Sequence, residues 1–251
     1  FCKKFNIDKI ISRVSDVKYQ YVLIGVNITI SIIYPIVLFS NDYANPLLLV
    51  IAYFLIILGV INFFELYKNI NLKRVKISKK YNILSLLIFL GIFLYFLISS
   101  SPVTNADSLD YHLFLGKKIV ENGKLLITST HFHSHLFGIG ESLIALGILV
   151  GSEQLGSIVQ FFGLVSIIGL IIKKNNKEIN IIAYIIGSPV LIFFLSTIKP
   201  QFFFIATNAL VFCLILFTNI KNNKTKITMY VLSLFLLGIS SQAKFSFMLS
   251  L

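Results

Sequence analysis

Residues 82–99 read NILSLLIFLGIFLYFLIS, an apolar run of 18 residues without a charged side chain. About 20 such residues in an α-helix cross the hydrocarbon core of a bilayer, and a run that is apolar on every side offers no polar face to water. Comparable runs recur along the chain, which is 57% hydrophobic and 13% charged, whereas soluble domains are about 25% charged. The sequence therefore predicts an all-α, polytopic membrane protein.

Seven apolar segments are expected to cross the membrane, which predicts about seven transmembrane helices. These segments are residues 19–40, 47–66, 82–99, 155–172, 181–198, 202–220 and the chain from 227 onward. Residues 1–81 then form an N-terminal two-span segment with basic loops, and residues 82–251 form a membrane core with a large loop at residues 100–152. Because the chain begins at Phe1 and ends inside an apolar stretch, we expect a fragment of a longer protein.

The basic residues orient these spans. Lys and Arg gather in four clusters, at residues 3–18, 68–80, 173–177 and 221–226. Cytoplasmic loops carry an excess of Lys and Arg, so we expect all four clusters and the N-terminus in the cytoplasm of a bacterial cell and residues 100–152 on the outer face of its plasma membrane. The net charge of +12 thus reflects the Lys and Arg residues of the loops expected in the cytoplasm. The sequence has no basic helix interleaved with stacking aromatics, which is the pattern that would indicate a nucleic-acid partner.

A shorter apolar segment, LFGIGESLIALGILVG at residues 136–151, tests this topology. If it crossed the membrane, every later basic cluster would move to the outer face. At its length an interfacial or re-entrant helix is the ordinary expectation. We therefore interpret it as part of the outer loop.

The outer loop carries Asp107, Asp110 and His112 within six residues. The stretch from residue 108 has helical periodicity that ends at Gly123, and it predicts an amphipathic helix lying on the outer membrane surface. Asp107 then has two interpretations. It is an N-cap that accepts the free amides of the first turn, or a general base that takes a proton from a substrate hydroxyl, with Asp110 as the second carboxylate.

The four histidines of the chain all lie between residues 112 and 135. In an extended strand, His131, His133 and His135 of HFHSH would point to one side, as metal ligands do. A catalytic zinc site also needs a defined scaffold and outer-shell partners, so a solvated polar loop is the alternative. No cofactor follows from these residues, and a divalent metal is left open.

Three further charged residues lie where a charge is costly. Glu141 sits within the short apolar segment, where an unpaired charge costs on the order of 2–3 kcal/mol, so it must reach the interface or a polar cavity. Lys199 and Lys244 lie at the expected outer ends of apolar segments. They either contact lipid headgroups or bind an anionic phosphate.

The stretches DSLDYHL, YHLFLGKKIVENGKL, GESLIALGILVG, STIKPQ and GISSQAKFSF resemble bacterial membrane glycosyltransferases of the GT-C superfamily. More distant similarity extends to protein O-mannosyltransferases and the lipid A aminoarabinose transferase. The resemblance covers residues 82–251. It implies a polytopic enzyme that takes a sugar from a polyprenyl-phosphate-linked donor and transfers it, with inversion, to a glycan, lipid or protein acceptor on the outer face.

The resemblance places Asp107 at the position of the essential acid of that superfamily. Some relatives carry an adjacent Asp-Glu pair there, whereas Ser108 follows here, so the second acid is Asp110 or comes from elsewhere. We predict Asp107 and Asp110 as catalytic residues. The predicted substrate-binding residues are His112, His133, His135, Glu141, Lys199 and Lys244. The alternatives are a polytopic transporter and a non-catalytic membrane scaffold protein.

Overall fold

The computed structural model describes residues 7–15, 17–39, 43–69, 83–124, 138–172, 179–217 and 222–243. Every regular element in these ranges is helical. In chain order they are α1 (Ile7–Ile11), α2 (Val17–Phe39), α3 (Ala44–Asn69), α4 (Ile83–Ser100), the π-helical turn η1 (Ser108–Leu113), α5 (Phe114–Asn122), α6 (Ile139–Leu149), α7 (Leu155–Ile172), α8 (Ile179–Ile186), α9 (Pro189–Ser196), α10 (Gln201–Phe217) and α11 (Asn223–Ala243).

The long helices confirm the prediction of a helical membrane protein. In the part of the chain that the structure describes, α2, α3, α4, α7 and α11 give five helices that are long and apolar enough to cross a bilayer. The number rises to six if α9 and α10 are counted as one bent span. The described chain is therefore an integral membrane protein of several spans, and the count of seven remains a prediction.

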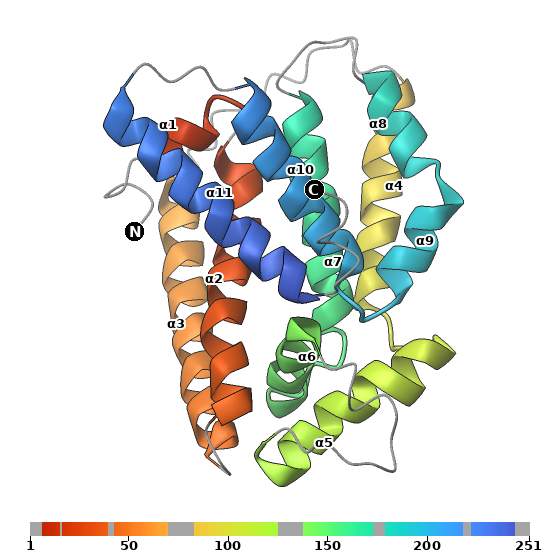
Figure 1. Ribbon diagram of the computed structural model, residues 1–251. Coiled ribbons are helices and arrows are strands. Elements are labelled where there is room, and N and C mark those ends of the chain that lie inside the picture. Colours follow the sequence, from red (N-terminus) through yellow and green to blue (C-terminus); the bar gives the residue numbers. More distant parts are fainter. Residues whose placement is uncertain are drawn as a thin grey trace.

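The segment at 181–198 differs from the single span that the sequence predicts. It forms two short helices, α8 and α9, which meet at Gly187 and Ser188. Pro189 lacks an N–H group and disfavours a helical conformation of the residue before it, so it begins a new helix. Together α8 and α9 still run beside α4 from its upper to its lower end (Figure 1). A bend of 113° follows between α9 and α10.

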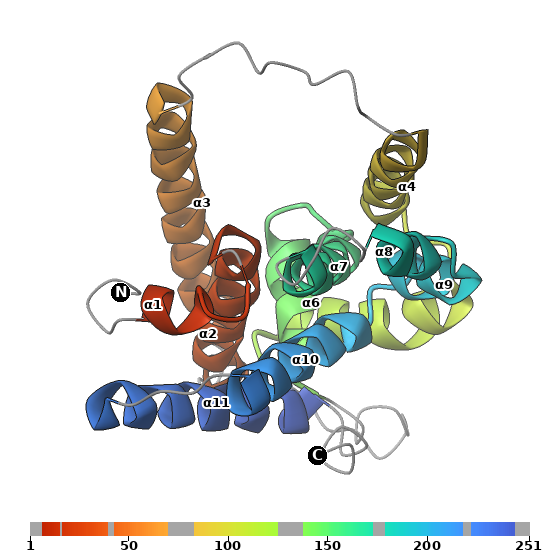
Figure 2. The same cartoon turned by 90° about the horizontal axis from the view of Figure 1, so that it is seen from above.

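Helix α7 lies at the centre of the bundle. More than half of its span, 56%, is buried inside the protein, against 17% for α3 and 11% for α4. Small residues allow this packing: a Cβ added at Gly163 would lie 3.0 Å from the Cα of Phe203 on α10. Seen from above, α3 and α4 stand apart on either side of this centre (Figure 2). The apolar faces that α3 and α4 leave exposed suit contact with lipid.

One end of the bundle holds all the short elements of the loop. Helices α2, α4, α9 and α11 end there, and η1, α5, α6 and the start of α7 lie at the same end, which we call the site end (Figure 1). The opposite end carries α1, the starts of α2 and α11, and the end of α3. Where the structure describes them, the basic clusters in α1, at the starts of α2 and α11 and at the end of α3 thus lie at the end opposite η1, α5 and α6. Their orientation relative to the cell remains a prediction.

Helix α6 corrects the interfacial interpretation of residues 136–151. All of its residues from Ile139 to Gly147 are buried, between α2, α3, α5 and α7. A helix that lay on the membrane surface would keep one face in water, so this alternative is wrong. The short apolar run is instead a core helix enclosed by protein.

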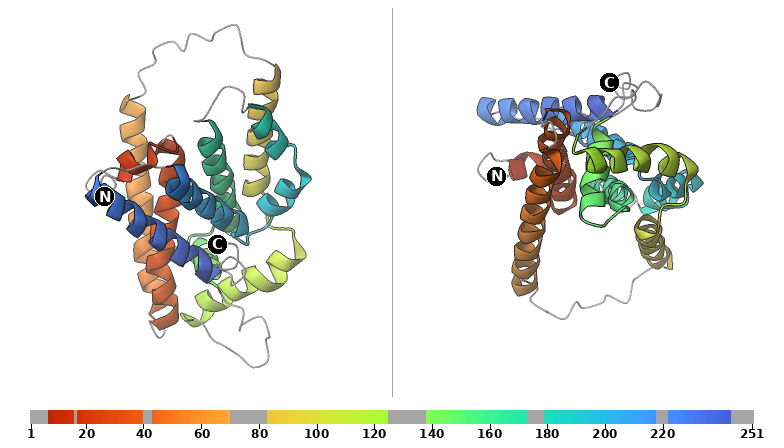
Figure 3. Two further views of the ribbon diagram at one scale, coloured as in Figure 1. Left: turned by 45° about the horizontal axis from the view of Figure 1, so that its top comes forward. Right: turned by 90° about the horizontal axis from the view of Figure 1, so that it is seen from below.

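Helix α5 is amphipathic, as predicted, and Gly123 ends it in the left-handed conformation with φ of 67°. Its apolar face, with Leu115, Gly116 and Ile119 buried, packs on α6, and Figure 3 shows α5 from below lying across that helix. The end of α5 is also tied to α3, because the Ala44 N–H donates to the Gly123 carbonyl at 3.2 Å. The helix therefore covers protein.

Candidate functional site

The site begins with the π-helical turn η1. In a π-helix the hydrogen bonds join residues five apart, which places such residues on one face, whereas an α-helix aligns residues three or four apart. Asp107 and His112 are five apart and lie on the same side of the turn. Asp110 is exposed, and Leu109 beside it is 43% exposed.

His112 and Glu141 form a buried pair. The His112 ring is 2% exposed, and its Nδ1 lies 2.6 Å from Glu141 Oε1. The other carboxylate oxygen, Oε2, accepts the N–H of Gly138 at 2.8 Å. Both oxygens of Glu141 are therefore hydrogen-bonded, which offsets the cost of burying the carboxylate. A charged Glu141 is therefore tolerated within an apolar segment because it is buried beside a histidine that pairs with it.

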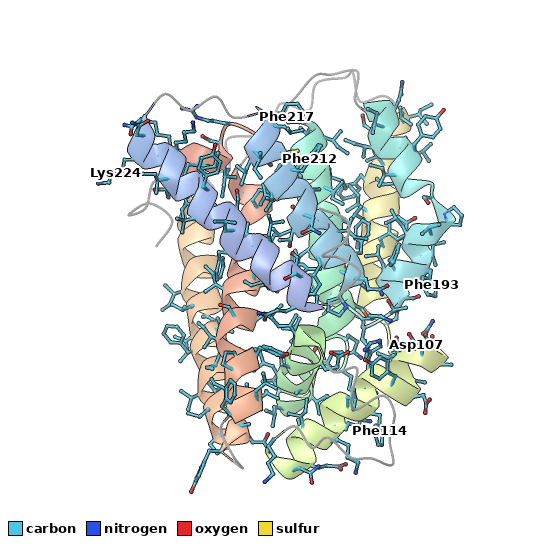
Figure 4. The ribbon with its side chains drawn as sticks, in the orientation of Figure 1. Asp107, Phe114, Phe193, Phe212, Phe217 and Lys224 are labelled. Atoms are coloured by element: carbon cyan, nitrogen blue, oxygen red, sulfur yellow. The ribbon has the colours of Figure 1, made fainter. Side chains whose placement is uncertain are left out.

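Asp107 lies at the surface, in front of this pair. Its side chain is 59% exposed, and its Oδ2 lies 3.8 Å from His112 Nε2 and 3.8 Å from Lys199 Nζ. Figure 4 labels Asp107 at the site end, below Phe193 of α9. The four side chains thus join η1, α6 and the turn between α9 and α10. The cluster brings together residues that lie up to 92 positions apart in the sequence, Asp107 and Lys199.

The N-cap interpretation of Asp107 was wrong. Asp107 has helical dihedral angles, with φ of −60° and ψ of −38°, and makes no side-chain cap hydrogen bond. The helix begins one residue earlier, and Asn105 Oδ1 accepts the N–H of Ser108 at 3.3 Å. Asn105 therefore does the capping, and Asp107 is left with its carboxylate at the surface.

Lys199 is positioned by the α9–α10 link, residues 197–200. The Ile198 N–H donates to Ser108 Oγ at 3.3 Å, which ties this link to η1. On the other side, the Thr197 carbonyl accepts from Ser157 Oγ and from Gln160 Nε2, each at 3.0 Å. The sharp bend is therefore held between η1 and α7, and Lys199 is brought to Asp107 by backbone contacts as well as by charge.

Gln160 is a residue that the sequence analysis missed. Its side chain is fully buried and also accepts the N–H of Phe202 at 2.7 Å, so it bonds both ends of the link. The signal was a lone amide in the middle of the apolar segment 155–172. A polar group inside a membrane span is expensive unless it has partners, so such a residue predicts an interhelical contact.

Tyr111 closes the buried side of the site. Its ring centroid lies 4.1 Å from that of His112. Burial, followed by the negative charges of Glu141 and Asp107, raises the pKa of the Tyr111 phenol. The phenol therefore stays protonated and neutral beside the cluster.

The structure does not bring every predicted residue together. Asp110 is exposed and has no ion pair with described residues. His131, His133, His135 and Lys244 lie outside the described residues. Within the described ranges no three His, Cys, Asp or Glu side chains gather as metal ligands. Burial of His112 and Glu141 places them behind Asp107.

A prediction about the link follows from Gly156, at the start of α7. A Cβ there would collide with the carbonyl oxygen of Ile198 and lie 2.9 Å from its carbonyl carbon. We expect Gly156→Ala to lower the free energy of unfolding by about 1–3 kcal/mol, the usual cost of overpacking. Gly238→Ala on α11 is the matched control, because nothing lies within 4 Å of its added methyl group. Equal melting temperatures for the two purified variants would contradict the packing of this link.

A comparison with family models places these elements in a known family. The model described as the DUF1420 N-terminal domain matches residues 63–251, a range that holds Asp107, His112, Glu141 and Lys199. Searches of curated proteins and of solved structures found no match. Because the family model matches well over half of the chain, the protein belongs to the family described as the DUF1420 N-terminal domain.

Proposed function

We propose that this protein is a membrane glycosyltransferase that moves a sugar from a polyprenyl-phosphate-linked donor to an acceptor hydroxyl at the outer face of the membrane. One observation carries the proposal. The exposed carboxylate of Asp107 lies at the site end of the spans, 3.8 Å from the ammonium of Lys199, with a buried His–Glu pair behind it. A carboxylate and a cation side by side are what transfer from a phosphate leaving group requires.

Asp107 is the proposed general base. A base must come within hydrogen-bond reach of the proton that it removes, and a side chain that is 59% exposed is open to an acceptor hydroxyl. The scaffold alternative gives Asp107 only the role of a helix cap. Asn105 fills that role instead, which supports the catalytic interpretation.

Lys199 is the proposed ligand of the donor phosphate. Its side chain is 20% exposed, so it is largely shielded from water and its interaction with an anion is strengthened. As the bond between the sugar and the phosphate breaks, negative charge grows on the leaving oxygen. A fixed cation stabilises that charge more in the transition state than in the ground state.

The place of the cluster also fits a lipid-anchored substrate. The headgroup of a polyprenyl phosphate lies at the membrane boundary, where its isoprenoid chain enters the hydrocarbon. Asp107 follows the end of α4, and Lys199 lies between the end of α9 and the start of α10, so both charges lie outside the apolar helices, which supports a site at the membrane boundary. The acceptor approaches from water to the exposed side of Asp107.

The test compares two classes of donor. Membranes that carry the full-length protein are given a radiolabelled sugar as a polyprenyl-phosphate conjugate or as a nucleotide conjugate, and labelled product is followed over time. We expect turnover of the lipid-linked donor alone. Consumption of the nucleotide sugar, or no turnover of either donor above membranes that lack the protein, would contradict the proposal.

A further inference from the structure

One side chain at the surface and two buried side chains behind it suggest a path along which a proton can move inward. Asp107 is 59% exposed, His112 behind it is 2% exposed, and Glu141 behind His112 is 6% exposed. Glu141 reaches His112 through Nδ1, and His112 faces Asp107 through Nε2. The imidazole thus connects a carboxylate at the surface to a second one in the core.

Glu141 determines which ring nitrogen carries the proton. Oε2 of Glu141 accepts from Gly138 at 2.8 Å, and Oε1 faces His112 Nδ1 at 2.6 Å. A carboxylate that accepts on both oxygens favours a histidine with its N–H at Nδ1. The lone pair of a neutral His112 is then on Nε2. That atom is buried and has no hydrogen-bond partner among the described residues.

An unpartnered buried nitrogen costs free energy and requires a reason. Asp107 Oδ2 lies 3.8 Å from Nε2, which is beyond hydrogen-bond range. Such contacts are often long in a free enzyme and shorten when substrate binds. The Asp107 side chain is largely exposed, so it has room to rotate toward Nε2.

Resting on the proposed function, we propose that His112 receives the proton that Asp107 takes from the acceptor, and that Glu141 orients His112 for this step. The acceptor O–H bond breaks and its proton moves to Asp107 Oδ2. The acceptor oxygen bonds to the anomeric carbon, and the bond from that carbon to the phosphate oxygen breaks with its electron pair on the polyprenyl phosphate. The proton then passes to His112 Nε2 and later returns to water through Asp107.

The arrangement follows the logic of a carboxylate that holds an imidazole in one tautomer and stabilises the imidazolium once it forms. Here the imidazole does not touch the substrate. His112 acts through Asp107, and Glu141 acts through His112, so both are positioning residues. The pair gives the proton on Asp107 a second place to go once the acceptor has reacted.

The first test reads the tautomer without any assay of transfer. A variant with His131→Gln, His133→Gln and His135→Gln keeps His112 as its sole histidine, since the chain has four. With 15N-labelled histidine, NMR distinguishes a protonated ring nitrogen from a bare one. We expect a proton on Nδ1 and a bare Nε2. A proton on Nε2, alone or together with one on Nδ1, would overturn the inference.

Adding Glu141→Gln to that variant sharpens the test. The oxygen of the new amide accepts from the Gly138 N–H, so its NH₂ group faces His112 Nδ1. Because an NH₂ group donates, Nδ1 must then accept, and the ring proton moves to Nε2. We expect the tautomer to reverse. An unchanged spectrum would show that Glu141 does not set the tautomer, and the inference would fail.

The second test measures kinetics in the otherwise native full-length protein. We expect His112→Gln and Glu141→Gln each to lower kcat by about 10²-fold, in the range of proton-transfer contributions, with little change in the KM for the lipid-linked donor. Combined with Asp107→Asn, neither should lower kcat further, because the three act as a unit. Glu121→Gln, an exposed carboxylate paired with Lys118, is the control with the same chemical change.

The outcomes separate the two proposals. If the wild-type protein turns over the donor and both positioning variants keep full kcat, the inference is overturned and the glycosyltransferase stands. If the wild-type protein turns over no lipid-linked donor, the proposed function fails, and the NMR result still decides the proton arrangement. Should His112→Gln not fold, Glu141→Gln carries the kinetic test, since it keeps the shape of the side chain.

Discussion

Asp107→Asn is expected to lower kcat for sugar transfer by about 10²–10⁴-fold, the usual contribution of a general base. The amide has nearly the same shape as the carboxylate, but it cannot accept a proton. The folded state should not change, because the Asp107 side chain is 59% exposed and makes no cap hydrogen bond. Initial rates with the labelled lipid-linked donor, at matched protein levels in membranes, measure the effect.

Asp110→Asn is the matched control for this variant. Asp110 lies three residues further along the chain, inside η1, carries the same charge and is exposed, but it is not joined to Lys199 or His112 by an ion pair. We expect its kcat to remain close to that of the wild type, in contrast to the sequence-based prediction that Asp110 is a second catalytic carboxylate. If Asp110→Asn lost transfer and Asp107→Asn did not, the catalytic carboxylate would be Asp110, and the geometry of the cluster would have misled us.

Gln160→Leu is expected to lower the free energy of unfolding by about 1–3 kcal/mol, the cost of leaving a buried polar group unpaired. The variant removes the acceptor of the Phe202 N–H, which has a bond of 2.7 Å in the structure. It also removes a donor to the Thr197 carbonyl. The α9–α10 link should loosen as a result. Thermal unfolding in detergent and hydrogen exchange at residues 197–202 measure the two effects.

Ser157→Ala separates this role of Gln160 from a general effect on α7. The Ser157 hydroxyl donates to the same Thr197 carbonyl, which keeps Gln160 as a partner when the hydroxyl is removed. No backbone group is then left unpaired, so we expect only a small loss of stability. Equal losses in the two variants would show that Gln160 does not hold the turn.

Much of the fold could be predicted from the hydrophobic pattern, because length and polarity alone decide whether a helix can cross a bilayer. Residues 82–99 match α4 almost residue for residue. The pattern misjudged residues 181–198 because hydropathy does not register that Pro189 interrupts backbone hydrogen bonding. It also misplaced residues 136–151, since a short apolar run carries the same signal whether lipid or protein surrounds it.

The candidate site was predictable only in part. Charge topology placed Asp107 and Lys199 at the same end of the protein, and the structure brings them to 3.8 Å. The pairing of His112 with Glu141 could not be predicted from the sequence. It depends on a π-helical turn and on a helix packed against it. If the segment were an α-helix, His112 would lie on a different face from Asp107.

The turn η1 also has a consequence for comparing this chain with its relatives. A π-helical turn holds one residue more than the α-helical turn that it replaces. A relative that lost this residue would keep the same overall path of the helix, with tyrosine and histidine shifted by one position relative to the acid. An ungapped alignment anchored at the acid would then place Tyr111 in the same column as the functional histidine of that relative. Spacing between the acid and the histidine, counted within each sequence, is therefore the better guide when orthologues are compared.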